Sequence, residues 1–430
     1  MHKTIRAFFF TGLATVFLAA NVAWAQPKPQ PVPSSVNLAQ NAVSAILIDA
    51  DTGTVLYEKN SRLKLPPASI TKIMTLLLVM EAIDRGKIKL TDKVRVSEYA
   101  ASMGGSQIFL EPGEEMTVED LIKGVAVASG NDASVALAEY VAGTEEAFVA
   151  MMNEKARQLG MTDTRFANSN GLPAPDHYTS ARDIAIMSRE LLKYEAITKY
   201  TGLYQDYLRK DTNRPFWLVN TNRLVRFYPG CDGLKTGYTS EAKFCLSATA
   251  KRDNFRVIAV VLGEPDTKTR NAEVAKMFDY AFSQYTTKPL YQRGDVIQEL
   301  PVEKGERERL PVVAARHFNL LMKRGEDAGQ YQTTVELPER VLAPVKAGDV
   351  LGHVVVTKQG QEVARLDLVA PVDVGAATFG QLWQRALNRL LHLPDAGRAN
   401  GDERNNREAA FDKASRFFVL SSKGRNGVCR

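Results

Sequence analysis

The apolar run from Ile73 to Met80 constrains the fold most, because as a helix it has no polar face and must be buried inside a domain. Two prolines and Ala68 precede Ser69, which places Ser69 at the start of this helix and Lys72 one turn later on the same face. An amine beside a buried hydroxyl loses solvation, so its neutral form becomes easier to reach. The pair therefore suits a nucleophile and its base, although Ser69 alone would also serve as an ordinary N-cap.

The segments around this helix predict an α+β domain. Strand patterns at 45–48 and 54–57 flank a turn and read as a hairpin, and three more strands follow at 233–238, 244–250 and 256–262. The residues between the two groups have mostly helical spacing, and a helix is expected from about 267 to 285. We expect a five-stranded antiparallel sheet flanked by helices.

The C-terminal part changes character after residue 285. Short strand-like runs between Gly and Pro turns predict a small all-β domain, and residues 379–393 then form a basic amphipathic stripe that contains Trp383. We interpret this stripe as a helix that lies on a membrane surface; packing against the β domain is the alternative. The predicted division is a signal peptide at 1–25, a linker at 26–39, a catalytic domain at 40–285, the β-rich domain at 286–378, the helix at 379–393 and a disordered tail at 394–430.

The N-terminus predicts export. Lys3 and Arg6 precede an apolar stretch, and Ala23-Trp24-Ala25 has the pattern of a signal-peptidase site. The net charge is +6, and the predicted mature chain would carry +4, too small and too scattered to favour nucleic acid as a partner. We therefore expect a periplasmic protein, attached peripherally to the outer face of the cytoplasmic membrane.

Cysteine and histidine usage favours neither a disulfide framework nor a metal site. The chain has three cysteines, Cys231, Cys245 and Cys429, and its five histidines are dispersed. Cys231 and Cys245 flank a predicted hairpin, so a bridge between them and two unpaired core thiols both stay open. No metal and no cofactor are expected.

Three short motifs occur in one order along the chain: Ser69-x-x-Lys72, then Ser129-Gly130-Asn131, then Lys235-Thr236-Gly237. Each is weak alone. Their predicted places, however, are the start of a buried helix, a loop between helices and an inner strand. This set is the signature of penicillin-binding proteins and class A β-lactamases.

On these motifs the chain resembles the D-alanyl-D-alanine carboxypeptidases, which are serine-type, low-molecular-mass penicillin-binding proteins, over residues of about 40 to 393. The resemblance implies the β-lactamase/penicillin-binding-protein-like fold, the β-rich domain and the C-terminal membrane-surface helix. It also implies removal of the terminal D-alanine from peptidoglycan stem peptides, and acylation by β-lactams.

The acyl transfer that this resemblance implies needs a nucleophile, a base and a proton relay. Ser69 would supply the hydroxyl, and Lys72 would accept its proton. Ser129 and Lys235 would relay that proton to the leaving amine, and the amide of Asn131 would hold the peptide group of the substrate.

Substrate binding would use the third motif. The backbone N–H of Ser69, at the positive end of its helix, would be one oxyanion donor, and the resemblance gives the N–H of Tyr238, after Gly237, as the other. Thr236 and Arg270 would bind the terminal carboxylate, Arg270 because its fork geometry suits carboxylates. His177 lies where the family has an active-site loop and is expected to act only from behind the contacting residues.

Three other functions share these motifs. A class A β-lactamase needs a glutamate in a Glu-x-x-x-Asn arrangement after the second motif, and none occurs between Ala133 and Lys235. D-Ala-D-Ala endopeptidase or transpeptidase action differs only in the peptide and acceptor that reach the acyl-enzyme. A penicillin-binding sensor of the cell wall would be acylated without turnover. The sequence leaves the last two open.

Overall fold

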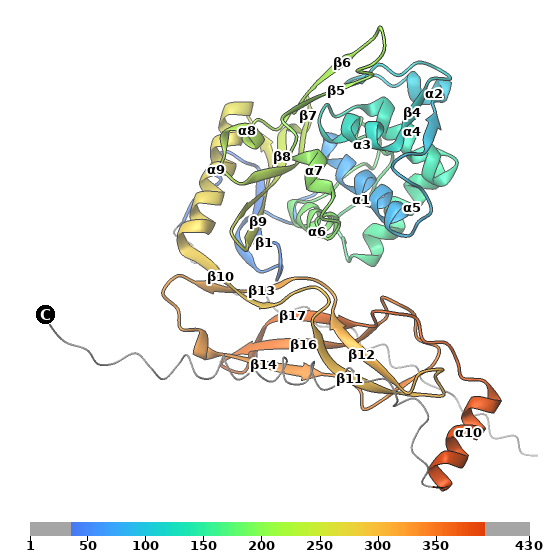
Figure 1. The fold of residues 1–430 in the computed structure, drawn as a ribbon. Coiled ribbons are helices and arrows are strands. Elements are labelled where there is room, and N and C mark those ends of the chain that lie inside the picture. Colours follow the sequence, from blue (N-terminus) through green and yellow to red (C-terminus); the bar gives the residue numbers. More distant parts are fainter. Residues whose placement is uncertain (1–35, 392–430) are drawn as a thin grey trace, which may run out of the picture. The chain divides into compact units, whose positions relative to one another are not determined.

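The computed structural model describes residues 36–391 (Figure 1). The predicted signal peptide, the tail at 394–430, Cys429 and part of the predicted linker and C-terminal helix lie outside the described residues. The chain divides into two compact units. Of the described residues, the first contains 36–291, 317–334 and 355–365, and the second contains 292–316, 335–354 and 366–391.

A five-stranded antiparallel sheet is the frame of the first unit. Its order is β2-β1-β9-β8-β7, from the strands β1 (Ser44–Asp49), β2 (Val55–Lys59), β7 (Cys231–Thr239), β8 (Lys243–Arg252) and β9 (Phe255–Glu264). The predicted hairpin and the three later strands are thus confirmed as one sheet. The strand of the third motif, β7, was predicted to be an inner strand, and this is wrong: β7 is an edge strand, so its outer backbone groups are available to a ligand.

The two faces of the sheet bury different cores, because alternate side chains point to opposite faces. One core contains Leu47 and Cys231 and packs against α9 (Thr267–Gln284), beside which lies α8 (Leu224–Phe227) (Figure 1). The other contains Ile46 and Cys245 and packs against the helices between residues 72 and 201. Cys231 and Cys245 therefore point to opposite faces, and both are free, buried thiols.

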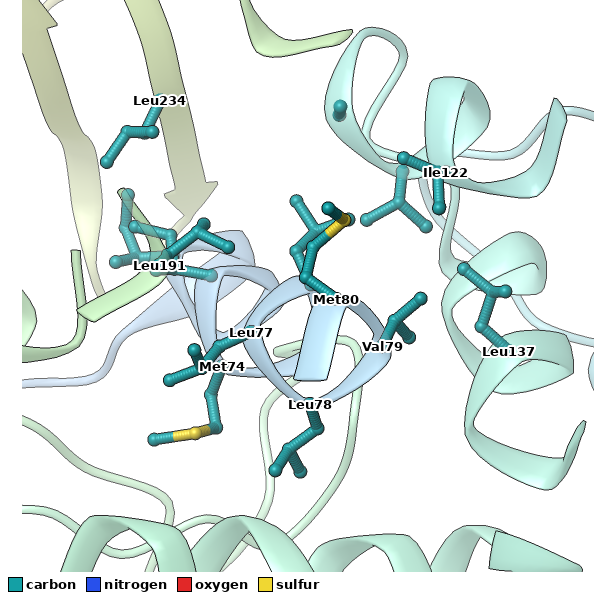
Figure 2. Close-up of a cluster of buried hydrophobic side chains, with 14 of the residues drawn as sticks. Met74, Leu77, Leu78, Val79, Met80, Ile122, Leu137, Leu191 and Leu234 are labelled. Atoms are coloured by element: carbon teal, nitrogen blue, oxygen red, sulfur yellow. The ribbon is translucent and has the colours of Figure 1, made fainter. Parts of the chain in front are cut away.

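Helix α1 (Lys72–Asp84) runs through the centre of the helical part, and its residues from Lys72 to Ala82 are all buried. Figure 2 shows its side chains pointing outward in several directions, with Leu191 on one side and Ile122 and Leu137 on the other. The helices around it are α3 (Val118–Ala126), α4 (Asn131–Ala142), α5 (Glu145–Gln158) and α6 (Ala181–Leu191). The predicted buried helix is confirmed.

The start of this helix differs from the prediction. Ala68–Thr71 form a 3-10 helix, η1, and the α-helix begins only at Lys72. The tighter turn follows from Pro67, whose carbonyl accepts from the Ile70 N–H at 3.1 Å, and from Ala68, which has a φ of 48°. Ser69 thus lies in a separate short turn in front of α1.

Several short elements complete the first unit and were not predicted, since strands of three or four residues have too little periodicity to be recognised. They are α2 (Glu98–Ala101), α7 (Ile197–Thr201), and the two-stranded pairs β3 (Lys93–Arg95) with β4 (Glu115–Thr117) and β5 (Gln205–Leu208) with β6 (Phe216–Val219).

The remaining strands make the C-terminal part β-rich, as expected. One two-stranded sheet pairs β10 (Tyr285–Tyr291) with β13 (Phe318–Lys323). A six-stranded sheet has the order β14-β16-β17-β12-β11-β15, from β11 (Val296–Glu303), β12 (Arg309–Ala314), β14 (Tyr331–Glu336), β15 (Val341–Leu342), β16 (Val350–Lys358) and β17 (Gln361–Val369). A 3-10 turn, η2 (Ala328–Gln330), precedes β14.

The second unit has its own small core, made by Val302, Leu310, Val345, Ala370 and Val374. Its last element is α10 (Phe379–Leu390). Between residues 36 and 391, no helix combines the length and apolar character needed to cross a membrane.

Candidate active site

The first two motifs meet at the Lys72 amine. Its Nζ atom lies 3.1 Å from Ser69 Oγ and 2.6 Å from Asn131 Oδ1, and it also donates to the Asn170 carbonyl. The amide of Asn131 is oriented by its other end, which donates to the Gly104 carbonyl at 2.6 Å. Besides its own side-chain carbon, the Lys72 nitrogen thus has three neighbours, which are Ser69 Oγ, Asn131 Oδ1 and the Asn170 carbonyl oxygen.

These contacts decide what Lys72 offers to Ser69. The two carbonyl oxygens can only accept, so they take two N–H groups of the amine. In the neutral amine the remaining position is a lone pair, and it faces the Ser69 hydroxyl. Complete burial lowers the pKa of Lys72 well below its ordinary value, and the nearby charge of Lys235 lowers it further. The arrangement favours the neutral, proton-accepting form.

The third motif lies directly against the nucleophile turn. Gly237 packs so closely on η1 that a Cβ there would lie 3.1 Å from the Pro67 carbonyl oxygen and 3.2 Å from Ala68 Cβ. This close contact of β7 with η1 favours glycine, because a Cβ would push on the turn. Tyr238, the next residue, has an exposed side chain that packs against Phe244 with the two rings tilted by 34°, at 4.4 Å between ring centroids.

Lys235 is almost fully buried, and its Nζ donates to the Thr236 carbonyl at 2.9 Å. Burial, together with the charge of Arg270, lowers the pKa of Lys235 to about 7. Arg270 is itself buried in the first turn of α9, where it donates to Asn271 Oδ1, and burial lowers its pKa to about 10. Among the described residues no carboxylate forms an ion pair with Lys235 or Arg270, although the charge of Glu264 partly offsets the lowering of the Arg270 pKa. Buried cationic groups without an ion-pair partner favour an anion beside them.

The hydroxyls of two other predicted residues, Ser129 and Thr236, form no hydrogen bond to either lysine within the described residues. Ser129 lies in the turn between α3 and α4, with a φ of 65° and a nearly buried side chain. Within residues 36–391 no hydrogen bond joins its hydroxyl to Lys72 or Lys235. The Thr236 hydroxyl donates to Thr221 Oγ1 at 2.7 Å.

Sequence reasoning missed two contributions. The Asn170 carbonyl is an acceptor for Lys72, but any residue has a carbonyl, so no sequence signal marks it. Asp132 accepts from the N–H groups of Ile108 and Leu110 and so fixes the loop that reaches Asn131. Its place directly after the second motif was a usable signal.

His177 is buried and forms hydrogen bonds with Thr71 and the Ala167 backbone, both at 2.8 Å. Burial lowers its pKa to about 4. It thus lies behind η1, as the sequence predicted. Within the described part of the chain, His, Cys, Asp and Glu side chains form no cluster of three or more that could hold a metal ion.

A serine hydroxyl facing a buried lysine amine, beside a glycine-packed edge strand, defines a class of protein: serine enzymes that transfer acyl groups with lysine as the base. The comparisons with known proteins specify the family. The family model described as D-alanyl-D-alanine carboxypeptidase matches residues 30–266, and that of the penicillin-binding protein 5 C-terminal domain matches residues 285–376.

Individual relatives agree with this match. The chain is 54% identical, over 81% of its length and 90% of the relative's, to the D-alanyl-D-alanine carboxypeptidase DacF of Bacillus subtilis (strain 168). It is similar to the crystal structure of penicillin binding protein 5 from Haemophilus influenzae, with a TM-score of 0.61 and 33% identity, covering 78% of this chain and 98% of that one. Penicillin-binding protein D2 from Listeria monocytogenes, solved in its ampicillin-bound form, has a TM-score of 0.52 and 28% identity, covering 57% of this chain and 100% of that one.

The chain belongs to the D-alanyl-D-alanine carboxypeptidase family, and it is a serine-type peptidase with the penicillin binding protein 5 fold.

Proposed function

We propose that the enzyme removes the terminal D-alanine from peptidoglycan stem peptides through an acyl-enzyme on Ser69. The observation that carries this proposal is the Lys72 nitrogen, which is held by two carbonyl acceptors and lies 3.1 Å from Ser69 Oγ. Ser69 Oγ attacks the carbonyl carbon of the penultimate D-alanine while its proton passes to Lys72. The backbone N–H groups of Ser69 and Tyr238 stabilise the oxyanion.

The next steps complete the hydrolysis. The C–N bond to the terminal D-alanine breaks, and its amine receives the proton through Ser129 and Lys235. Water then attacks the ester carbonyl, returns a proton to the Lys72 site and releases the shortened peptide, restoring the Ser69 hydroxyl. Asn131 Oδ1 holds Lys72 in position, and one N–H of its amide donates to the Gly104 carbonyl. The second N–H of the same amide would donate to the peptide group of the substrate.

The substrate carboxylate would bind beside Lys235, Thr236 and Arg270. The charge of Arg270 lowers the affinity of the buried Lys235 amine for its proton, and a bound carboxylate would relieve that repulsion. The Thr236 hydroxyl would turn from Thr221 to the carboxylate. β-Lactams place a carboxylate and a reactive carbonyl in the same relation, so they would acylate Ser69.

Release of D-alanine from a soluble pentapeptide tests this function. Wild type and the control Lys251→Ala, an exposed lysine on β8, should release D-alanine at similar rates, and Ser69→Ala should release none above background. D-alanine release by Ser69→Ala at the wild-type rate would contradict the proposal. Release from a pentapeptide but not from a cross-linked dimer would favour carboxypeptidase over endopeptidase action, and a stable acyl-enzyme without release would favour a sensor.

We further propose that α10 binds a membrane surface and that the enzyme acts outside the cytoplasmic membrane. Phe379, Trp383, Leu387 and Leu390 are exposed, and the rings of Phe379 and Trp383 stack. Arg385, in contrast, donates to two backbone carbonyls of the same unit, at 2.7 and 2.8 Å. Hydrogen bonds thus attach the polar side of the helix to its own unit, while its apolar side chains stay exposed, as a membrane-surface helix requires.

Matched substitutions test this anchor on vesicles that contain anionic lipid. Trp383→Glu should abolish binding, whereas Gln384→Glu, the same charge on a neighbouring exposed position, should weaken it only slightly. Truncation after Thr378 should release the protein and leave D-alanine release unchanged. Vesicle binding that survives the truncation would show that α10 is not the anchor.

A further inference from the structure

A chain of hydrogen bonds leads from His177 to the backbone in front of the nucleophile. The Ala167 N–H donates to His177 Nδ1 at 2.8 Å, so Nδ1 carries no proton, and in the neutral imidazole the proton is on Nε2. Nε2 lies 2.8 Å from Thr71 Oγ1 and therefore donates to it. Thr71 Oγ1 in turn donates to the Ala68 carbonyl at 2.9 Å. In this series of hydrogen bonds, each donor has one acceptor and the position of each proton is determined.

The last acceptor of this chain belongs to the peptide group that contains the Ser69 N–H. A peptide group is planar and trans, so its C=O and N–H point in opposite directions. Because the Thr71 hydroxyl donates to the Ala68 oxygen, the Ser69 N–H points away from Thr71. This N–H is at the second position of η1, where a helix provides no acceptor for it.

The backbone here needs such a restraint. Ala68 has a φ of 48°, a left-handed conformation that an alanine rarely adopts. Gly171 packs on the same carbonyl, where a Cβ would lie 1.9 Å from the Ala68 oxygen. Thr71 and Ala68 are fully or almost fully buried, and His177 is 8% exposed, so water competes little for these hydrogen bonds.

We propose that His177 is a positioning residue, which acts through Thr71 to aim the Ser69 backbone N–H at the oxyanion. This inference rests on the proposed acylation of Ser69 and adds a role for two side chains that do not touch the substrate. If so, the rate of acylation depends on the hydrogen bond from Nε2 to Thr71. Nδ1 has a different role, because it accepts from the Ala167 N–H and holds the segment around Ala167 against the imidazole.

Two substitutions of His177 separate these sides. The amide nitrogen of His177→Gln lies near the place of Nε2 and can still donate to Thr71, whereas the amide of His177→Asn lies near the place of Nδ1 and can serve only Ala167. Removal of one oxyanion donor lowers kcat by about 100- to 1,000-fold, so a misdirected donor should cost roughly 10- to 100-fold. We expect His177→Asn to lower the rate of acylation by a fluorescent penicillin by that factor and His177→Gln to stay within about 3-fold of wild type.

Thr71 provides an independent pair. Thr71→Val has almost the same shape but no hydroxyl and should lose acylation as His177→Asn does, and Thr71→Ser should retain it. In D-alanine release the loss should fall on kcat, with KM little changed. These two Thr71 variants test whether the hydroxyl positions the Ser69 N–H even if both His177 variants unfold.

Three results would overturn the proposal: His177→Gln slower than His177→Asn, Thr71→Val at the wild-type rate, or acylation that falls only in proportion to the folded fraction seen in thermal melts. Failure of the proposed function gives a different result, because covalent labelling would then persist in Ser69→Ala.

Discussion

Lys235 is predicted to destabilise the fold at neutral pH. Its side chain is 1% exposed, and its pKa falls from 10.5 to about 7. A lysine whose pKa is lower in the folded state binds fewer protons there than in the unfolded chain, so the free energy of unfolding rises with pH between about 7 and 10.5. At about 1.4 kcal/mol per pKa unit, the buried amine costs roughly 4 kcal/mol at pH 7.

Replacing Lys235 by methionine removes this cost. Urea unfolding of Lys235→Met at pH 7, in a buffer without phosphate or sulfate, should show a gain of up to about 4 kcal/mol over wild type, together with loss of D-alanine release. At pH 10 the gain should shrink to less than about 1 kcal/mol. Lys251→Met, on the exposed part of β8, should change stability by less than about 0.5 kcal/mol at both pH values.

A loss of stability in Lys235→Met at pH 7, or a gain that does not shrink at pH 10, would refute the argument. A gain that does not shrink would mean that the stability comes from the packing of methionine and not from removal of the buried charge. A loss would mean that the amine is paired with an anionic group in the folded protein. Such pairing would also remove the basis for a carboxylate site at Lys235 and Arg270.

Three further predictions concern the same structure. If Lys235 acts as a cation, kcat/KM should fall as the pH rises through about 7, because the amine then loses its proton. In Lys235→Arg this fall should move well above pH 7. A fall that stays near pH 7 in this variant would mean that another group causes it. Gly171→Ala should lower both the melting temperature and the acylation rate, because its Cβ would lie 1.9 Å from the Ala68 oxygen; unchanged thermal melts would show that the loop yields. Alkylation of the native protein should leave Cys231 and Cys245 unmodified, and denaturation without reductant should expose both thiols, whereas a missing pair would reveal a disulfide.

The sequence predicted the sheet and the central helix because long elements carry strong periodicity. The strands β8 and β9, with ten residues each, alternate between two cores, and the residues from Ile73 to Met80 fill the middle of the helical part. The pair β5–β6 was missed because each strand has four residues.

The prediction of the site was limited by backbone contributions. Ser69, Lys72 and Asn131 were named from their motifs, and the structure brings them into contact. The Asn170 carbonyl and the left-handed Ala68 have no signature in side-chain identity, since both depend on how a loop and a turn are packed. His177 was named from its place in the sequence, but its partners, the Thr71 hydroxyl and the Ala167 backbone N–H, were not, because they depend on the same packing.

The most direct test of the account is the site of covalent attachment of penicillin. The protein is incubated with a penicillin, digested and mapped by mass spectrometry, in parallel with Ser69→Ala and Lys72→Ala. We expect one acylated peptide, modified at Ser69, no adduct in Ser69→Ala, and acylation of Lys72→Ala slowed by at least about 100-fold. An adduct on another residue, or wild-type acylation without the Lys72 amine, would contradict this expectation.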